Sequence, residues 1–229
     1  ICSVGADAVY VGVVPTPAIA YLTRHYGYDA GVVISASHNP SEYNGIKFFN
    51  GDGYKLSDLL EDEIEEVMRM NSAELPMPVG GEVGHITYRY DAKDDYVRFA
   101  CSLIDLDLSG LKIVVDTAEG ASYYTAPKTL ESLGAKPVVI HNHPDGVNIN
   151  RACGSTHMEE LKKRVVEEGA DLGIAFDGDA DRMLAVDENG NMVDGDQIMA
   201  ICGLYMRNQG RLKKDTVVAT VMSNLGFFR

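Results

Sequence analysis

Short runs of apolar residues, many of them β-branched, alternate along this chain with helix-like stretches, and no other feature limits the fold as much. Five of these runs have the length and composition of buried strands, at residues 9–14, 31–35, 111–115, 137–140 and 172–176. Helical patterns follow several of them, and glycines at positions 27, 134 and 169 stand where helices are expected to end. Strands that alternate with helices build βαβ units around a parallel sheet. We therefore predict an α/β fold made of consecutive mixed domains.

Further local signals complete the expected order of elements. Ser57 is expected to cap an acidic helix that extends to about Met70, and residues 71–84 are expected to form a loop. Thr156 and Glu159 have the spacing of a capping box, which predicts a helix that continues to residue 168. The other expected helices cover residues 15–26, 121–133 and 197–208, with one more starting near residue 91. The other expected strands are 46–49, the Asn-Gly hairpin 183–186 with 192–193, and 216–221.

The excess of acidic side chains limits the kinds of molecule that the chain is expected to bind. The chain has 34 acidic and 20 basic side chains and a formal net charge of −14. Such a surface repels nucleic acid and anionic membranes, so we expect neither as a partner. No apolar run reaches the roughly 18 residues that a membrane-spanning helix needs. If the substrate is an anion, basic groups inside the motifs must overcome this charge.

The cysteines and the first residues indicate the cellular compartment of the chain. The four cysteines lie far apart without a C-x-x-C pair, which favours free thiols in a reducing cytoplasm over zinc or disulfides. The first apolar run lacks the basic leader of a signal peptide. We therefore expect a cytoplasmic protein. Because the sequence starts without methionine on an apolar stretch, we also expect a fragment of a longer protein.

Residues 35–40 (Ser-Ala-Ser-His-Asn-Pro) form a polar turn directly after an expected strand. In open α/β sheets, sites collect beyond the carboxyl ends of strands. Small residues let the backbone turn tightly there and leave a hydroxyl group exposed. On these residues alone, a hydrophilic turn without chemistry is an equal alternative. A serine-hydrolase elbow is disfavoured, because the glycines of Gly-x-Ser-x-Gly are missing.

Three aspartates, Asp177, Asp179 and Asp181, alternate in a tight loop after the expected strand 172–176. Carboxylates are the ligands that a hard cation such as Mg²⁺ prefers. An EF-hand is disfavoured because its sixth position must be glycine and is Arg182 here. A solvated acidic turn remains the alternative, and in either case we expect the carboxylates to be exposed. Arg182 suits a bidentate grip on a phosphate, or neutralises the aspartates.

Lys47 stands at the edge of the expected strand 46–49. With a depressed pKa it could take up a hydroxyl proton, and with its charge it could stabilise a phosphate. An ordinary surface lysine is the alternative. His141 and His143 are expected at a strand end and in the loop that follows. We expect Cys153 to be a buried, inert thiol, and Asp194 to cap the helix 197–208.

Together these motifs resemble those of the α-D-phosphohexomutase family. The resemblance rests on segments 34–40 (Ile-Ser-Ala-Ser-His-Asn-Pro), 44–48 (Asn-Gly-Ile-Lys-Phe) and 173–182 (Gly-Ile-Ala-Phe-Asp-Gly-Asp-Ala-Asp-Arg). Segments 146–150 (Gly-Val-Asn-Ile-Asn) and 153–157 (Cys-Gly-Ser-Thr-His) resemble the bacterial branch that acts on glucosamine phosphates. The resemblance implies that residues 1–90 are the C-terminal part of domain 1 with the phosphoserine loop. It implies that residues 91–192 are domain 2 with the metal loop and that residues 193–229 begin domain 3.

The resemblance also implies roles for the site residues. Ser37 would carry the phosphoryl group, and one Mg²⁺ would be bound by that phosphoserine and the three aspartates. His38 and Lys47 would lie close to the transfer, and Arg182 with Lys47 would contact phosphate.

The reaction implied is the interconversion of glucosamine 6-phosphate and glucosamine 1-phosphate through a 1,6-bisphosphate. It would serve UDP-N-acetylglucosamine and cell-wall synthesis. The alternatives are a phosphoglucomutase/phosphomannomutase and a non-catalytic module that binds metal or phosphosugar. A phosphorylated hexosamine is the expected partner, with a homodimer left open. We expect the chain by itself to be inactive, because the family's sugar-recognition loop and fourth domain are not in it.

Overall fold

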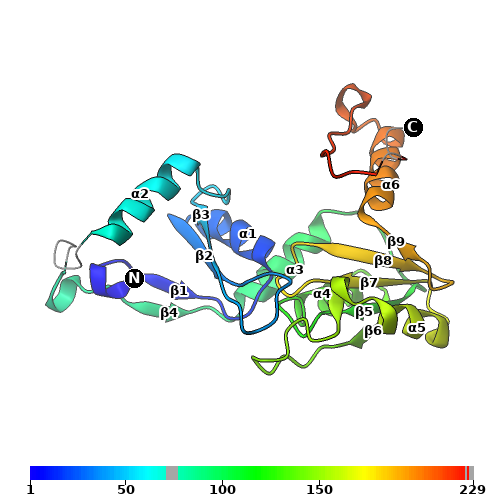
Figure 1. Ribbon diagram of the computed structural model, residues 1–229, viewed down its shortest axis with the longest axis horizontal. Helices are drawn as coiled ribbons and strands as arrows, with labels where there is room; N and C mark the ends of the chain where they lie inside the picture. Colours follow the sequence, from blue (N-terminus) through cyan, green and yellow to red (C-terminus); the bar gives the residue numbers. More distant parts are fainter. Residues whose placement is uncertain (71–76, 225, 227–229) are drawn as a thin grey trace.

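The computed structural model of the chain describes residues 1–70, 77–224 and 226, which fold into two α/β units followed by a helix (Figure 1). The α-helices are α1 (Thr16–Tyr26), α2 (Asp58–Arg69), α3 (Ala92–Ser102), α4 (Thr125–Ser132), α5 (Glu159–Glu168) and α6 (Gly195–Asn208). The strands are β1 (Ala8–Tyr10), β2 (Ala30–Ile34), β3 (Ile46–Asn50), β4 (Ile86–Tyr88), β5 (Lys112–Asp116), β6 (Lys136–Ile140), β7 (Leu172–Phe176), β8 (Met183–Asp187) and β9 (Met192–Val193). Short 3-10 turns are η1 (Cys2–Val4), η3 (Gly80–Glu82), η4 (Gly154–Thr156) and η5 (Lys213–Asp215).

The first unit consists of β1 to β4 with α1 and α2. Strand β1 pairs in parallel with β4, and β2 pairs antiparallel with β3. Helix α1 carries Pro17 in its first turn, where no backbone donor is needed, and it ends at Gly27 in the left-handed conformation. The predicted cap of α2 is confirmed, since the Ser57 hydroxyl accepts from the backbone N–H of Leu60 at 3.4 Å.

The second unit is built on a five-stranded sheet with the order β6-β5-β7-β8-β9. Strand β5 runs parallel to both β6 and β7, as the βαβ pattern predicts. Strands β7, β8 and β9 are antiparallel, and β8 with β9 is the predicted Asn-Gly hairpin. The sheet is therefore mixed, with a parallel part made of β6, β5 and β7.

Alternate residues of β5 face opposite layers of the second unit, because successive side chains of a strand point to opposite faces. Val114 packs in one core cluster with Leu161 and Val165 of α5. Ile113 and Val115 pack in another cluster, to which Leu130 of α4 also belongs. Helices α5 and α4 thus cover the two faces of the sheet (Figure 1).

Helix α3 connects the two units through contacts with both of them. Ala92 belongs to the core cluster of α1, and the hydroxyl of Tyr26 donates to Asp95. On the other side, the hydroxyl of Tyr124 donates to Asp94 Oδ1 at 2.5 Å. Helix α3 therefore fixes α1 relative to the second unit, together with the loops next to α1.

The capping box expected at Thr156 and Glu159 is wrong. Thr156 ends the 3-10 turn η4, and Met158 is the residue before α5, without a side-chain cap. The backbone N–H of Gly154 is held by the buried carboxylate of Asp116 at 2.9 Å, which anchors this segment as a 3-10 turn. A capping box lies instead at α6, where Asp194 and Gln197 cap each other, so the expected cap at Asp194 is confirmed.

Other expected elements differ in extent or do not form. Residues 216–221 are not a strand, because a strand needs a partner for its backbone groups and no described residue pairs with them. Strand β1 ends at Tyr10 instead of residue 14, and α4 begins at Thr125 after a turn over residues 121–124. Of the expected loop 71–84, residues 71–76 lie outside the described residues. None of the described helices is long and apolar enough to cross a bilayer.

The fold predicts a difference between two positions of α5. Leu161 is fully buried, so Leu161→Ala should lower the free energy of unfolding of this chain by about 2–5 kcal/mol. Val166 lies on the same helix and is 55% exposed, so Val166→Ala should change that energy by no more than about 0.5 kcal/mol. Urea denaturation followed by circular dichroism measures both values. Equal losses in the two variants would contradict the packing described here.

Candidate active site

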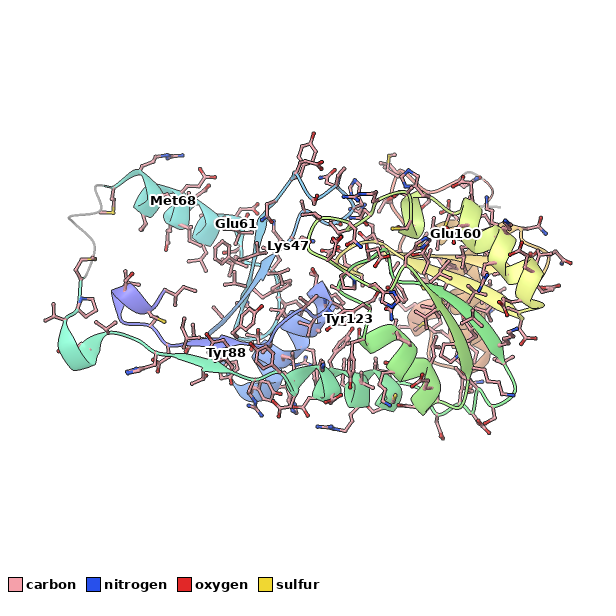
Figure 2. All side chains as sticks on the ribbon, turned by 90° about the horizontal axis from the view of Figure 1, so that it is seen from below. Lys47, Glu61, Met68, Tyr88, Tyr123 and Glu160 are labelled. Carbon is pink, nitrogen blue, oxygen red and sulfur yellow. The ribbon has the colours of Figure 1, made fainter. Side chains whose placement is uncertain are left out.

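Two loops from different units meet at one point of the structure. The hydroxyl of Ser37, which follows β2, donates to Asp177 Oδ2, which follows β7, at 2.8 Å. Both residues lie beyond the carboxyl end of a strand, where sites of α/β proteins collect. Figure 2 shows Lys47 of β3 near the middle of the molecule, between the strands of the first unit and the loops of the second. The structure thus brings the predicted serine, lysine and aspartate motifs together.

The backbone of Ser37 adopts a left-handed conformation, with φ at 56°. Positive φ is uncommon for a residue with a Cβ atom, and such strain persists only where the surroundings hold it. The hydroxyl of Ser35 accepts from the backbone N–H of Ser37 at 3.0 Å and supports the turn. Nothing in residues 35–40 predicted this conformation.

The three aspartates form a tight cluster whose ligand oxygens lie within 4.8 Å of one another. Asp177 and Asp179 are only 1% and 2% exposed, so the expectation of exposed carboxylates holds for Asp181 alone. The physical reason is the start of α1, which covers the loop. Thr16 Oγ1 donates to Asp179 Oδ2 at 2.7 Å, and the backbone N–H of Thr16 donates to the Asp179 carbonyl at 2.9 Å.

Burial and neighbouring groups shift the pKa values of the two buried aspartates in opposite directions. Burial raises the pKa of Asp177, and the nearby Asp179 charge adds to the rise, although the Ser37 hydrogen bond opposes it. Burial also acts to raise the pKa of Asp179, but hydrogen bonds from Lys47 and Thr16 outweigh it and lower that pKa. The partners of Asp179 thus outweigh its burial, whereas burial of Asp177 outweighs the hydrogen bonds from Ser37 and Arg182.

The cluster fits a hard divalent cation. Asp179 Oδ1 is buried and accepts no hydrogen bond from any of the described residues. A buried carboxylate oxygen normally has a partner, and a metal ion supplies one. Three carboxylates facing one point match the oxygen ligands that Mg²⁺ prefers.

Lys47 forms ion pairs with two members of the cluster. Its Nζ lies 2.6 Å from Asp179 Oδ2 and 3.2 Å from Asp181 Oδ2. Burial disfavours the charged lysine, but the contacts with the two carboxylates outweigh it and raise the pKa of Lys47. A lysine that acts as a general base needs a lowered pKa. The two carboxylates therefore favour the other role expected for Lys47, that of a fixed positive charge.

Arg182 and His38 stand at the exposed side of the site. Arg182 Nη1 lies 3.4 Å from His38 Nδ1, and Arg182 Nε lies 3.8 Å from Asp181 Oδ1. The Arg182 side chain is 64% exposed, while its backbone N–H donates to Asp177 Oδ1 at 3.2 Å. The arginine therefore closes the acidic loop with its backbone and offers its guanidinium group to solvent.

Three residues of the site were not predicted, namely Thr16, Asn150 and Gly178. Thr16 lies in a Pro-Thr-Pro segment that signalled only the start of a helix. Asn150 lies in segment 146–150, which contributed to the resemblance without an assigned role. A Cβ atom at Gly178 would lie 2.7 Å from the Ser37 carbonyl oxygen, so only glycine fits between the two loops.

A second polar cluster lies at the carboxyl ends of β5 and β6. His141 follows β6 as expected, with Nδ1 3.0 Å from the buried carboxylate of Asp116 and Nε2 3.1 Å from Glu160 of α5. The Asp116 carboxylate 3.0 Å from Nδ1 and the charge of Glu160 outweigh burial and raise the pKa of His141 to about 8. Cys153 is fully buried, and burial raises the pKa of its thiol to about 12, as expected for an inert side chain. All four cysteines are free.

Three family models match the chain in order along its length. They are the phosphoglucomutase/phosphomannomutase alpha/beta/alpha domain I at residues 1–74, domain II at residues 94–190 and domain III at residues 194–229. Together they cover most of the sequence.

Curated proteins and solved structures agree with this match. The chain is 62% identical to a phosphoglucosamine mutase of Acetivibrio thermocellus and 64% identical to one of Clostridium novyi, each over 226 residues. Both alignments cover 99% of this chain and 50% of the relative, so the chain spans about half the length of the curated relatives it matches. Its fold resembles that of a phosphoglucomutase/phosphomannomutase family protein from Burkholderia thailandensis, with a TM-score of 0.72 and 24% identity. That match covers 90% of this chain and 46% of the other.

The contact between His141 and Asp116 predicts a stability that depends on pH. A pKa raised from 6.5 to about 8 corresponds to about 2 kcal/mol of stabilisation. Because the pKa is higher in the folded state, this contribution is fully present below about pH 6.5 and disappears as the pH rises through 8.

The variant His141→Gln should therefore be less stable than the unaltered chain at pH 6, and the gap should narrow by about 2 kcal/mol by pH 9. Urea denaturation at both pH values measures the gap. His143→Gln, at an exposed position two residues further on, is the control and should produce no such narrowing. A gap for His141→Gln that stays constant from pH 6 to pH 9 would contradict the assignment.

Proposed function

The chain belongs to the phosphoglucomutase/phosphomannomutase family, and on that premise we propose that it carries the phosphoryl-donor part of a phosphoglucosamine mutase. The observation that carries the proposal is the 2.8 Å contact between the Ser37 hydroxyl and Asp177, which sets a nucleophile against a cation-binding cluster. Identities of 62% and 64% to phosphoglucosamine mutases support glucosamine phosphate as the substrate.

In the proposed reaction Ser37 donates one phosphoryl group to the sugar and then accepts another from it. Ser37 in its active form carries a phosphoryl group on Oγ. The C1 hydroxyl of glucosamine 6-phosphate attacks that phosphorus, the bond from phosphorus to Oγ breaks, and the sugar becomes a 1,6-bisphosphate. After the sugar reorients, Oγ attacks the phosphorus at position 6. Glucosamine 1-phosphate then leaves and the phosphoserine is restored. The proton lost by one hydroxyl group in each step is gained by the other.

We assign the binding of one Mg²⁺ to Asp177, Asp179, Asp181 and the phosphate on Ser37. When bound, the ion neutralises charge on the phosphoryl group during transfer, which is the main requirement of phosphoryl-transfer chemistry. The tight cluster of carboxylates and the partnerless Asp179 Oδ1 support this assignment.

The basic residues supply the remaining positive charge in our proposal. Lys47, held by two carboxylates, stabilises the transferred group as a cation. Arg182 and His38, which stand together at the exposed side of the site, contact the incoming phosphosugar. These contacts attract an anion to a protein whose net charge of −14 repels it.

Further assignments follow from the same family. We divide the chain into residues 1–90, 91–192 and 193–229, as the C-terminal part of domain 1, domain 2 and the start of domain 3. The partner is a phosphorylated hexosamine, and the four free cysteines fit the cytoplasm. A homodimer has no specific support among the contacts described. A phosphoglucomutase or phosphomannomutase activity is the second candidate, and it shares every residue named here.

Intact-mass spectrometry of the full-length protein tests the proposal. After incubation with a hexose 1,6-bisphosphate and Mg²⁺, the protein should gain the mass of one phosphoryl group, because Ser37 accepts it. Ser37→Ala should not gain that mass and should have no mutase turnover. Ser41→Ala, four residues further along the same loop, is the matched control and should gain it.

Two results would count against the proposal. A Ser37→Ala protein that still gains the phosphoryl mass would place the nucleophile elsewhere. An unaltered protein that never gains it would favour a non-catalytic binding module. Turnover compared on glucosamine, glucose and mannose 6-phosphates separates the first candidate from the second.

A further inference from the structure

The side chain of Asn150, in the second unit, bonds to the backbone of the loop that carries Ser37. The Nδ2 group of Asn150 donates to the Ser37 carbonyl at 2.9 Å and to the Asn39 carbonyl at 3.0 Å. Asn150 is only 6% exposed, so water competes little for these two bonds. Both amide hydrogens of this side chain are thus directed at the backbone of the serine loop.

Asn150 is itself fixed to strand β5 of the second unit. Its backbone N–H donates to the Ala118 carbonyl at 2.9 Å, and the Ala118 N–H donates to Asp116 Oδ1 at 2.8 Å. Asp116 is the fully buried last residue of β5, and it also pairs with His141. Hydrogen bonds therefore lead without a break from the core of the sheet to the carbonyl group of Ser37.

The acidic loop packs directly onto this connection. A Cβ atom at Gly178 would lie 2.6 Å from Asn150 Nδ2 and 2.7 Å from the Ser37 carbonyl oxygen. Gly178 stands between Asp177 and Asp179, so Asn150, the serine loop and the acidic loop are in mutual contact. A shift of the Asn150 amide would therefore move Ser37 relative to Asp177.

We propose that Asn150 is a positioning residue, which holds Ser37 in its left-handed conformation and thereby aims Oγ at the metal-binding aspartates. The inference rests on the proposed function, because it concerns the same transfer. With φ at 56°, Ser37 is in a conformation that its own sequence disfavours, and the two bonds from Asn150 to carbonyl groups of its loop offset that cost. In-line transfer needs the hydroxyl group in one place, so the orientation of this loop controls the rate.

Asparagine suits this position for two separate reasons. Its own φ is 57°, a region that asparagine tolerates better than most residues. Its amide supplies two donors, whereas an aspartate of the same shape would oppose two carbonyl oxygens with a carboxylate. Glycine keeps the backbone conformation and removes only the side chain. Both substitutions therefore remove the amide donors and leave the backbone conformation at position 150 in place.

The test measures turnover of the full-length protein with glucosamine 6-phosphate for Asn150→Gly and Asn150→Asp. We expect kcat to fall roughly 100-fold in both variants, because a displaced nucleophile no longer meets the phosphorus in line. We expect KM to change by less than about threefold, since substrate binding does not use Asn150. Mn²⁺ affinity of the unphosphorylated Asn150→Gly protein, measured by electron paramagnetic resonance, should stay within about threefold of that of the unphosphorylated unaltered protein, since all three aspartates are kept.

Asn148→Gly is the matched control. Its side chain bonds within its own loop, donating to the His143 carbonyl and accepting from the Asp145 N–H, both at 3.0 Å. It should retain kcat within about threefold. If Asn150→Gly does not fold, the isosteric Asn150→Asp variant still decides.

Three results would overturn the inference. They are a kcat within threefold of the unaltered protein in the Asn150 variants, an equal loss in Asn148→Gly, or a loss confined to KM. If the Asn150 variants keep full turnover while Ser37→Ala has none, the positioning role fails and the proposed function stands. If Ser37→Ala also keeps turnover, the proposed function fails and the positioning role fails with it.

Discussion

Three carboxylates crowded at the end of β7 impose the constraint that the rest of the site satisfies. Their ligand oxygens lie within 4.8 Å of one another, and Asp177 and Asp179 are almost fully buried. Like charges at such separations repel strongly where water is excluded. Three donors offset this repulsion by binding the carboxylates, namely the Thr16 hydroxyl, the Ser37 hydroxyl and the Lys47 ammonium group. All three donors belong to the first unit, so their bonds to the acidic loop of the second unit also hold the two units together.

The same arrangement reconciles an acidic protein with the anionic substrate proposed for it. A net charge of −14 repels phosphosugars at long range, yet Lys47 contacts the acidic loop and Arg182 contacts His38 of the serine loop. Lys47 is paired with two aspartates, so its charge is fixed in place, while the exposed Arg182 is available to an incoming phosphate. Charge at this site is therefore set by local geometry. Phosphoryl transfer depends on such positioned charges more than on covalent chemistry by the protein.

Sequence patterns were sufficient where the cause of a structure is local. The run before Asp177 and the Asn-Gly hairpin have short-range signals, and both elements formed as predicted. The left-handed φ of Ser37 and the bond from Asn150 could not be predicted, because they depend on residues 113 positions apart. The burial of Asp179 depends in the same way on Thr16, 163 positions away. The prediction of a strand at residues 216–221 was wrong for a related reason, since a strand forms only when another segment pairs with it.

The central claim is that a divalent metal and the phosphate on Ser37 share one site. The most direct measurement is the ³¹P NMR spectrum of the phosphorylated full-length protein during a titration with Mn²⁺. A paramagnetic ion held by the aspartate cluster lies beside the phosphate. The phosphoserine resonance should therefore broaden beyond detection near one equivalent of Mn²⁺ and return in excess Mg²⁺. A resonance that stays sharp while Mn²⁺ binds the protein would contradict the central claim.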